Sequence, residues 1–261
     1  MKKLTLIGAG PGDPELFTLK GIKALQKADI VLYDALASEE LLDYAYNAKE
    51  KVFVGKRFGC HALSQNEINQ LILEYSNSYD HIVRLKGGDS FVFGRAQEEI
   101  ETAKKAGMQI EVVPGISSAL AVPAGHLIPM TARGTNQSFW VVTGTTCKGD
   151  ISGDLHLAAQ SGATVVILMA MNKLEEITEI FTRFGKAKTP VAIIQNGTLK
   201  NEKIVRGSID NIYARAMHEK LSNPSVIVIG NVVPLNETVT NKININEEAY
   251  TDYTTILKAA M

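Results

Sequence analysis

A short apolar run ends in a glycine-rich turn at residues 4–13, LTLIGAGPGD. Leu4 to Ile7 has the length and composition of a buried strand, and the glycines behind it allow the chain to turn sharply. The next apolar residues lie three positions apart, as on one face of a helix, at Leu16, Leu19, Ile22 and Leu25. The stretch therefore predicts a strand–turn–helix unit near the N-terminus.

The same alternation continues through the first half of the chain. Further apolar runs at 30–33, 81–85 and 110–113 have the length of strands, and segments with helical periodicity lie between them. One such segment follows a capping box, Ser64 to Glu67, and another extends from about Phe93 to Ala106. Strands that alternate with helices predict an α/β fold with a mostly parallel, doubly wound sheet.

The second half has a different pattern. Between Ile194 and Ile204 the polar stretch is too short for a helix, so these two predicted strands should pair antiparallel. A polar, turn-prone segment at 133–136 indicates a boundary. We therefore expect three parts: an N-terminal α/β domain at 1–135, a second α/β domain at 136–236, and a polar, loosely docked tail at 237–261.

The composition argues against several classes of protein. The formal net charge is −1, which predicts no bulk attraction to nucleic acid or to an anionic membrane. No apolar run approaches the roughly 20 residues of a membrane helix, and the N-terminal run is too short for a signal peptide. Two cysteines without CxxC spacing and five scattered histidines predict neither a disulfide framework nor a metal site. We expect a cytoplasmic protein.

The turn at 8–13 allows several interpretations. A dinucleotide-binding fingerprint would follow a first strand in this way, and Asp34, after the second strand, could bind the ribose. The third glycine, however, comes one residue early, and Pro11 lacks the N–H that a pyrophosphate would use. A tight turn without any ligand, and a backbone cradle for a different cofactor, both remain open.

Two other strand ends carry similar chemistry. The stretch RLKGGDSFVFGR at 84–95 places a Gly-Gly-Asp turn after a strand, and PGISSA at 114–119 follows the next strand. In a parallel sheet, ligands bind beyond the carboxyl ends of the strands. Three glycine-rich strand ends at one edge predict a site for a flat, polar ligand that is uncharged or cationic.

Taken in order, these stretches resemble one family, the uroporphyrinogen-III C-methyltransferases of the tetrapyrrole methylase superfamily. The resemblance covers roughly residues 3 to 234. Its landmarks are GAGPGDPE at 8–15, VLYD at 31–34, GKR at 55–57, RLKGGDSFVFGRAQEE at 84–99, VVPGISSA at 112–119, IPMTARG at 128–134, TVVILM at 164–169, AIIQNGT at 192–198 and IVIGNVV at 227–233.

The resemblance implies two α/β domains with S-adenosylmethionine in the cleft between them, and a homodimer. It also implies two successive methyl transfers to carbon atoms of uroporphyrinogen III, which give precorrin-2 through a monomethylated intermediate, in siroheme or cobalamin biosynthesis. Carried over by position, the residues that contact the cofactor are Pro11, Gly87, Gly88, Asp89, Val92, Ser117, Ser118, Met169 and Gly197.

The same resemblance implies a catalytic pair and a substrate site. Asp34 corresponds to the proton acceptor and Lys56 to the proton donor, while Arg95, Glu98 and Arg133 occupy positions around the substrate. The reaction requires a proton acceptor, because the methylated macrocycle must lose a proton. Its eight carboxylates suit the bidentate fork of arginine. An ordinary surface ion pair remains the alternative for Arg95 and Glu98.

Some positions depart from the pattern of the family. Ser90 stands where proline is usual, Ala96 where glycine is usual, and Leu127, Ala132 and Ala170 are further departures. They affect the fit of the substrate more than the identity of the cofactor. The alternatives are superfamily members that methylate later cobalamin precursors, diphthine precursors or ribosomal RNA, a nicotinamide oxidoreductase, and a tetrapyrrole binder without catalytic activity.

Overall fold

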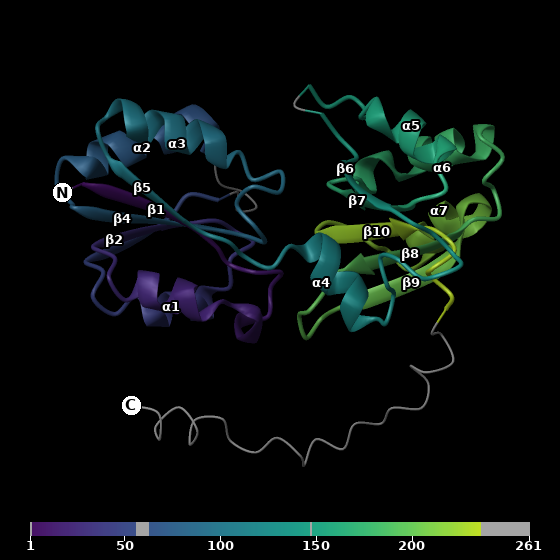
Figure 1. The fold of residues 1–261 in the computed structure, drawn as a ribbon, viewed down its shortest axis with the longest axis horizontal. Coiled ribbons are helices and arrows are strands. Elements are labelled where there is room, and N and C mark those ends of the chain that lie inside the picture. Colours follow the sequence, from purple (N-terminus) through teal and green to yellow (C-terminus); the bar gives the residue numbers. More distant parts are fainter. Residues whose placement is uncertain (1, 56–62, 147, 236–261) are drawn as a thin grey trace, which may run out of the picture.

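A computed structural model describes residues 2–55, 63–146 and 148–235 of the 261-residue chain, which form two five-stranded sheets (Figure 1). The first sheet has the strand order β3-β2-β4-β1-β5, and all of its pairs are parallel. Its strands are β1 (Lys3–Gly8), β2 (Ile30–Tyr33), β3 (Glu50–Phe53), β4 (His81–Lys86) and β5 (Gln109–Val113). The predicted parallel sheet is confirmed.

Helices cover both faces of this sheet, because its strands are apolar on both sides. Ile7, Val31 and Leu85 pack against one layer of helices, and Leu6 and Leu32 pack against the other. The first layer contains α1 (Leu19–Leu25) and the 3-10 helix η2 (Glu39–Tyr44), and the second contains α2 (Gln65–Ser76) and α3 (Ala96–Lys105) (Figure 1).

The starts of α2 and α3 show how well local signals predict helix ends. The capping box is confirmed: the Ser64 N–H donates to Glu67 Oε2 at 2.6 Å, and the Glu67 N–H donates to Ser64 Oγ at 3.3 Å. Helix α3 begins at Ala96 and not near Phe93 as predicted. Phe93 and Arg95 both have φ of 55°, a left-handed conformation that a helix cannot continue.

The second sheet has the order β6-β7-β10-β8-β9 and mixes strand directions. Only β6 and β7 are parallel within it; the other pairs are antiparallel. Ile194 faces Ile204 across the β8–β9 pair, so the predicted antiparallel pairing is confirmed. The strands are β6 (Phe139–Thr143), β7 (Thr164–Leu168), β8 (Pro190–Gln195), β9 (Lys203–Ser208) and β10 (Ser225–Ile229).

Helix α4 (Ser118–Gly125) follows the last strand of the first sheet but packs against the second sheet. Its buried residues Ala119 and Val122 belong to one apolar cluster with Val166 and Val228. The opposite face of that sheet carries α5 (Asp154–Gln160), α6 (Leu174–Arg183) and α7 (Ile209–His218) (Figure 1). The division of the chain near residue 135 stays a prediction, and any such division must account for the packing of α4.

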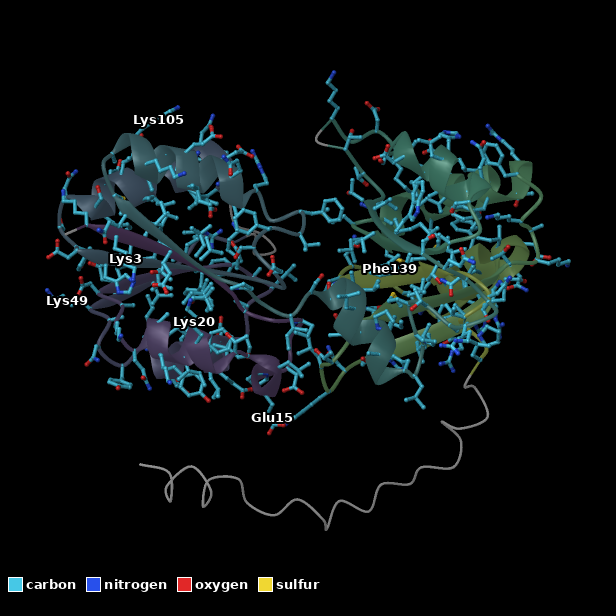
Figure 2. The ribbon with its side chains drawn as sticks, viewed as in Figure 1. Lys3, Glu15, Lys20, Lys49, Lys105 and Phe139 are labelled. Atoms are coloured by element: carbon cyan, nitrogen blue, oxygen red, sulfur yellow. The ribbon has the colours of Figure 1, made fainter. Side chains whose placement is uncertain are left out.

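Lysines such as Lys49 and Lys105 are exposed and extend outward from the first half of the chain (Figure 2). None of the helices within residues 2–55, 63–146 and 148–235 has the length and apolar character needed to span a bilayer. The tail predicted at 237–261 lies outside the described residues.

His81 at the start of β4 should make folding stability depend on pH. Its ring Nδ1 lies 2.7 Å from the Lys27 carbonyl oxygen and its Nε2 lies 2.8 Å from Thr5 Oγ1, a set of partners that suits the neutral ring. Burial lowers the pKa of His81, and Lys3 adds to this, against opposing effects from the Lys27 carbonyl, Asp29 and Glu111. Because the pKa is lower in the folded state, the contribution to stability is complete above about pH 6.5 and is lost as the pH falls.

We therefore expect the free energy of unfolding in urea to fall between about pH 7.5 and about pH 5.5, and His81→Gln to reduce this fall. His218→Gln is the matched control, since the His218 side chain is exposed. Equal pH dependence in both variants and in the parent protein would contradict the assignment to His81.

Candidate active site

Three backbone segments meet at the carboxyl edge of the first sheet, after β1, β4 and β5. A Cβ added to Gly8 would lie 2.5 Å from Gly115 N and 2.6 Å from the Gly88 carbonyl oxygen, closer than real side chains approach. A Cβ on Gly115 would overlap the same Gly88 oxygen and the Gly8 backbone. Glycine is therefore required at positions 8 and 115 for the three backbone segments to touch, and these two residues together with Gly88 form what we call the glycine floor.

The two glycine-rich loops predicted to bind a cofactor are joined directly. Gly10 and Gly88 exchange backbone hydrogen bonds of 3.2 Å and 2.7 Å in an isolated antiparallel bridge. Gly88 has φ of 65°, and a Cβ placed there would have no atom within 4 Å. The backbone at Gly88 consequently faces open space, which is the condition for a ligand to approach it closely.

Asp89 ties the loop after β4 to the loop after β5. One carboxylate oxygen accepts the Phe91 N–H at 2.8 Å, and the other accepts the Gly115 N–H at 2.9 Å. In this structure both oxygens thus hold the loops, whereas the resemblance assigns Asp89 to cofactor contact. Because this carboxylate accepts two backbone hydrogen bonds, it fixes the relative positions of the two loops.

The loops after β2 and β4 carry large apolar side chains in exposed positions. Phe91 is 57% exposed, and Leu36, whose Cβ lies 2.6 Å from the place that a Cβ on Gly87 would take, is 59% exposed. Val92 and Phe93 in the same loop are also exposed. Apolar side chains that gather beside a polar backbone edge are typical of a surface that binds a flat organic ligand.

The turn between β8 and β9 of the second sheet lies against the glycine-rich loop at 8–13. The Asp13 N–H from the first glycine loop donates to Thr198 Oγ1 at 3.1 Å. A Cβ on the neighbouring Gly197 would overlap the Val122 side chain of α4, the helix that Ser117 caps at its N-terminus. The structure therefore brings the predicted residues of the loop at 8–13, the start of α4 and Gly197 into one region.

Met169 follows β7 and is 51% exposed. Its φ of 55° is unusual for a residue with a side chain, and its carbonyl oxygen accepts the Thr145 hydroxyl at 2.9 Å. A strained, exposed position at a strand end is the kind of place where ligands bind. The contact of Met169 with a cofactor stays a prediction.

Asp34 lies at the end of β2, and its carboxylate is held from inside the protein. Its Oδ1 accepts a hydrogen bond of 2.6 Å from Arg84, whose side chain is almost fully buried. Arg84 in turn contacts Glu99, which is completely buried. Sequence reasoning missed this role for Arg84 and Glu99. The available signal was the alternation Arg84-Leu85-Lys86 within a strand whose neighbours are apolar.

Arg95 and Glu98 form a bidentate pair with each other, at 2.7 Å from Nε to Oε1 and 2.8 Å from Nη2 to Oε2. Both side chains are about half exposed, and the hydrogen bond from Arg95 lowers the pKa of Glu98. Arg133 is exposed in the segment before β6, and no hydrogen bond within the described parts of the chain joins it to this pair. Lys56 lies outside the described residues.

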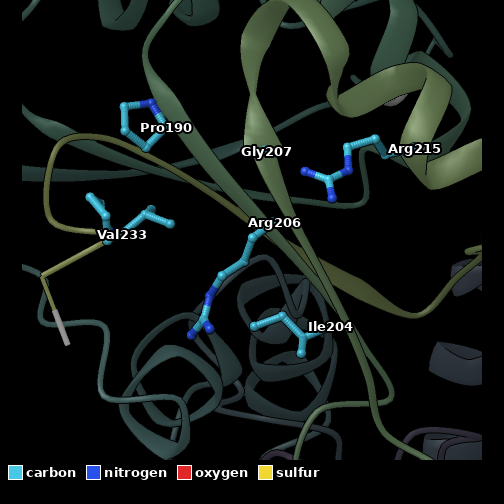
Figure 3. Close-up of a pocket in the computed structure, with 7 residues that line it drawn as sticks. Pro190, Ile204, Arg206, Gly207, Arg215 and Val233 are labelled. Atoms are coloured by element: carbon cyan, nitrogen blue, oxygen red, sulfur yellow. The ribbon is translucent and has the colours of Figure 1, made fainter. Parts of the chain in front are cut away.

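A separate cavity of about 560 Å³ lies beside the edge strand β9 (Figure 3). Arg206 on β9 and Arg215 on α7 border it, together with Pro190 and Val233 (Figure 3). None of the residues predicted for the active site lines this cavity. The cavity is open to solvent, and its described lining contains no acidic or nucleophilic side chains. We therefore expect the active site at the glycine floor and not in this cavity.

Comparison with known proteins identifies the family of this chain. The family model of the tetrapyrrole (corrin/porphyrin) methylases matches residues 3–213. The uroporphyrinogen-III C-methyltransferase of Methanocaldococcus jannaschii is 46% identical over 88% of this chain and 96% of its own length.

Two solved structures have the same fold. One is a uroporphyrin-III C-methyl transferase from Thermus thermophilus complexed with S-adenyl homocysteine, with a TM-score of 0.77 and 34% identity over 89% of this chain and 94% of that one. The other is a cobalt precorrin-4 methyltransferase, with a TM-score of 0.78 and 28% identity over 88% and 95% of the two chains. The family model and the M. jannaschii relative both cover most of the sequence. The chain therefore belongs to the tetrapyrrole methylase family.

Proposed function

We propose that this protein transfers methyl groups from S-adenosylmethionine to carbon atoms of uroporphyrinogen III. The activity comprises two transfers, which give precorrin-2 through a monomethylated intermediate. The observation that carries the proposal is the open backbone at Gly88, joined to Gly10 and placed beside exposed apolar side chains. The name of the M. jannaschii relative, and the S-adenyl homocysteine in the T. thermophilus structure, support the substrate and the cofactor.

The residues at the glycine floor fit S-adenosylmethionine. Open space at Gly88 admits a ligand next to backbone groups, and the carboxylate of Asp89 supplies negative charge near a site for a sulfonium. The residues that would hold the cofactor are Pro11, Gly87, Gly88, Asp89, Val92, Ser117, Ser118, Met169 and Gly197. When bound, the cofactor supplies an electrophilic methyl group.

The side chains of this protein supply the remaining parts of the reaction. Asp34 accepts the proton that the methylated macrocycle loses, and Arg84 keeps its carboxylate in a fixed position. Arg95 and Arg133 bind carboxylates of the substrate through guanidinium forks, and Arg95 exchanges its pairing with Glu98 for this purpose. Lys56 is the proton donor in this proposal. The protein acts as a cytoplasmic homodimer in the synthesis of siroheme or cobalamin.

Incubation with uroporphyrinogen III and methyl-labelled S-adenosylmethionine, followed by mass analysis of the oxidised product, tests the proposal. We expect a product that carries two labelled methyl groups, preceded in time by a product that carries one. A reaction that stops at one methyl group would contradict the second transfer. Labelled ribosomal RNA with an unlabelled macrocycle would assign the chain to another branch of its family.

A further inference from the structure

A charged cluster is buried between the first sheet and the helices α2 and α3. Arg84 and Lys86 extend from β4 on the same face, and Glu99 reaches them from α3. The three residues are 1%, 4% and 0% exposed, respectively. Asp34, whose side chain is 26% exposed, is the one acidic partner of this cluster among the described residues that reaches solvent.

Glu99 is the anchor of the cluster. Its Oε1 accepts hydrogen bonds from Arg84 Nε at 3.1 Å, from Lys86 Nζ at 2.8 Å and from Gln65 Nε2 at 3.2 Å. Two cations then face two carboxylates, those of Glu99 and Asp34, so the formal charges balance. Burial and the positive charge of Arg84 lower the pKa of Lys86, whereas the two carboxylates overcome the effect of burial and raise the pKa of Arg84.

Stability alone does not account for such a cluster. Replacing buried ion pairs by apolar residues of similar size is often neutral or stabilising, because charges lose hydration when they are buried. Glu99 Oε2 is also buried without a hydrogen-bond partner in the described structure, which adds a cost. What the cluster does provide is a rigid connection from the interior to the Asp34 carboxylate at the sheet edge.

The guanidinium of Arg84 is held on every nitrogen. Nε donates to Glu99, and Nη1 donates to the carbonyl oxygens of Leu32 at 3.4 Å and Leu85 at 3.1 Å. The remaining nitrogen, Nη2, donates to Asp34 Oδ1. Because the planar group has no freedom to rotate, it fixes the position of that oxygen. The hydrogen bonds of the described residues leave Asp34 Oδ2 to accept a proton.

We propose that Arg84, anchored by Glu99, is the positioning residue for Asp34 in the methyl-transfer reaction. The inference rests on the proposed function, since it requires Asp34 to accept the proton. Arg84 itself lies too deep to touch the substrate, and it acts through one oxygen of Asp34. A lysine at this position would keep the charge but could not reach Glu99, two carbonyl oxygens and Asp34 in one plane.

Arg84→Lys tests the proposal against Arg183→Lys, the same change in an exposed pair with Glu179 on α6. We expect Arg84→Lys to lower kcat on the order of a hundredfold, the effect of a misplaced reacting group. KM for uroporphyrinogen III and the affinity for S-adenosylhomocysteine should stay close to the parent values. Arg183→Lys should leave all three quantities unchanged.

A double-mutant cycle with Asp34→Asn separates positioning from a general structural role. If Arg84 acts through Asp34, adding Arg84→Lys to Asp34→Asn should lower kcat no further. A full additional loss in the double variant, or a parent-like kcat in Arg84→Lys, overturns the positioning role while the proposed function stands. A parent protein that methylates no tetrapyrrole overturns the proposed function and the role of Asp34 together.

Glu99→Gln is the second variant, in case Arg84→Lys does not fold. The amide retains Oε1 as an acceptor for Arg84 and Lys86 but removes the anchoring charge. We expect a smaller loss of kcat, again with unchanged KM and again absent in the Asp34→Asn background. If neither variant folds, as judged by thermal unfolding and S-adenosylhomocysteine binding, the cluster serves the fold and the proposal is wrong.

Discussion

Gly88→Val should abolish the binding of S-adenosylmethionine while the protein remains folded. A Cβ at this position would have no atom within 4 Å, so the valine side chain would extend into the space that the cofactor needs. The positive φ of 65° adds a backbone penalty of about 1–2 kcal/mol, which a domain of ordinary stability tolerates. Titration calorimetry with S-adenosylmethionine and S-adenosylhomocysteine should show no heat of binding.

Gly107→Val is the matched control for the backbone penalty. Gly107 also has a positive φ, 74°, and open space at its Cβ position. It lies between α3 and the start of β5, at the amino-terminal ends of the parallel strands and therefore away from the glycine floor. It should lower the melting temperature to a similar extent and bind the cofactor normally. Normal binding by a folded Gly88→Val variant would show that the cofactor lies elsewhere. Binding of NAD by the parent protein, without S-adenosylmethionine binding, would revive the dinucleotide interpretation of the loop at 8–13.

Asp34→Asn should lower kcat for methylation of uroporphyrinogen III by about a hundred- to ten-thousandfold, the usual contribution of a proton acceptor. Asparagine has the same shape, and its amide oxygen can still accept the hydrogen bond from Arg84. Binding of S-adenosylhomocysteine should therefore be retained. Steady-state rates from the labelled-methyl assay, with cofactor affinity from calorimetry, measure the two effects separately.

Asp154→Asn provides the control for this charge change, since Asp154 is exposed in the first turn of α5. It should keep the parent rate. A parent-like kcat in Asp34→Asn would remove the proton-acceptor role, and a parallel loss of cofactor affinity would place Asp34 in the cofactor site instead.

The first sheet could be predicted because its strands and helices alternate with clear periodicity. The run at 30–33 matches β2, and the pair Ile194–Ile204 was predicted from the shortness of the polar link alone. Strand β3 was missed, because two of its four residues are charged and exposed. Helix α4 was missed as well, since a segment that is apolar on all sides and contains Pro123 lacks a helical pattern.

In the candidate site too, some features could be predicted from the sequence and others could not. Glycine-rich strand ends identify the edge of the sheet, because few other residues permit backbones to touch. The left-handed conformation of Arg95 and its bidentate pairing with Glu98 depend on the course of a whole loop, which no short pattern encodes. Arg84 and Glu99 are fifteen residues apart and meet only after α3 packs on the sheet, so their contact has no local signal.

The glycine floor has a consequence for how this family could diverge. Its shape is determined by main-chain atoms of Gly8, Gly88 and Gly115, so we expect substitutions of neighbouring side chains to leave this shape unchanged. Phe91 and Arg95 lie farther along the loop between β4 and α3, and we expect that they can vary without altering the proposed binding of the methyl donor. If the methyl donor binds at this floor as proposed, we expect that the acceptor molecule can change during evolution while the donor site is kept. The retention of one fold at 28% identity, in a cobalt precorrin-4 methyltransferase, is the pattern that such a separation would leave.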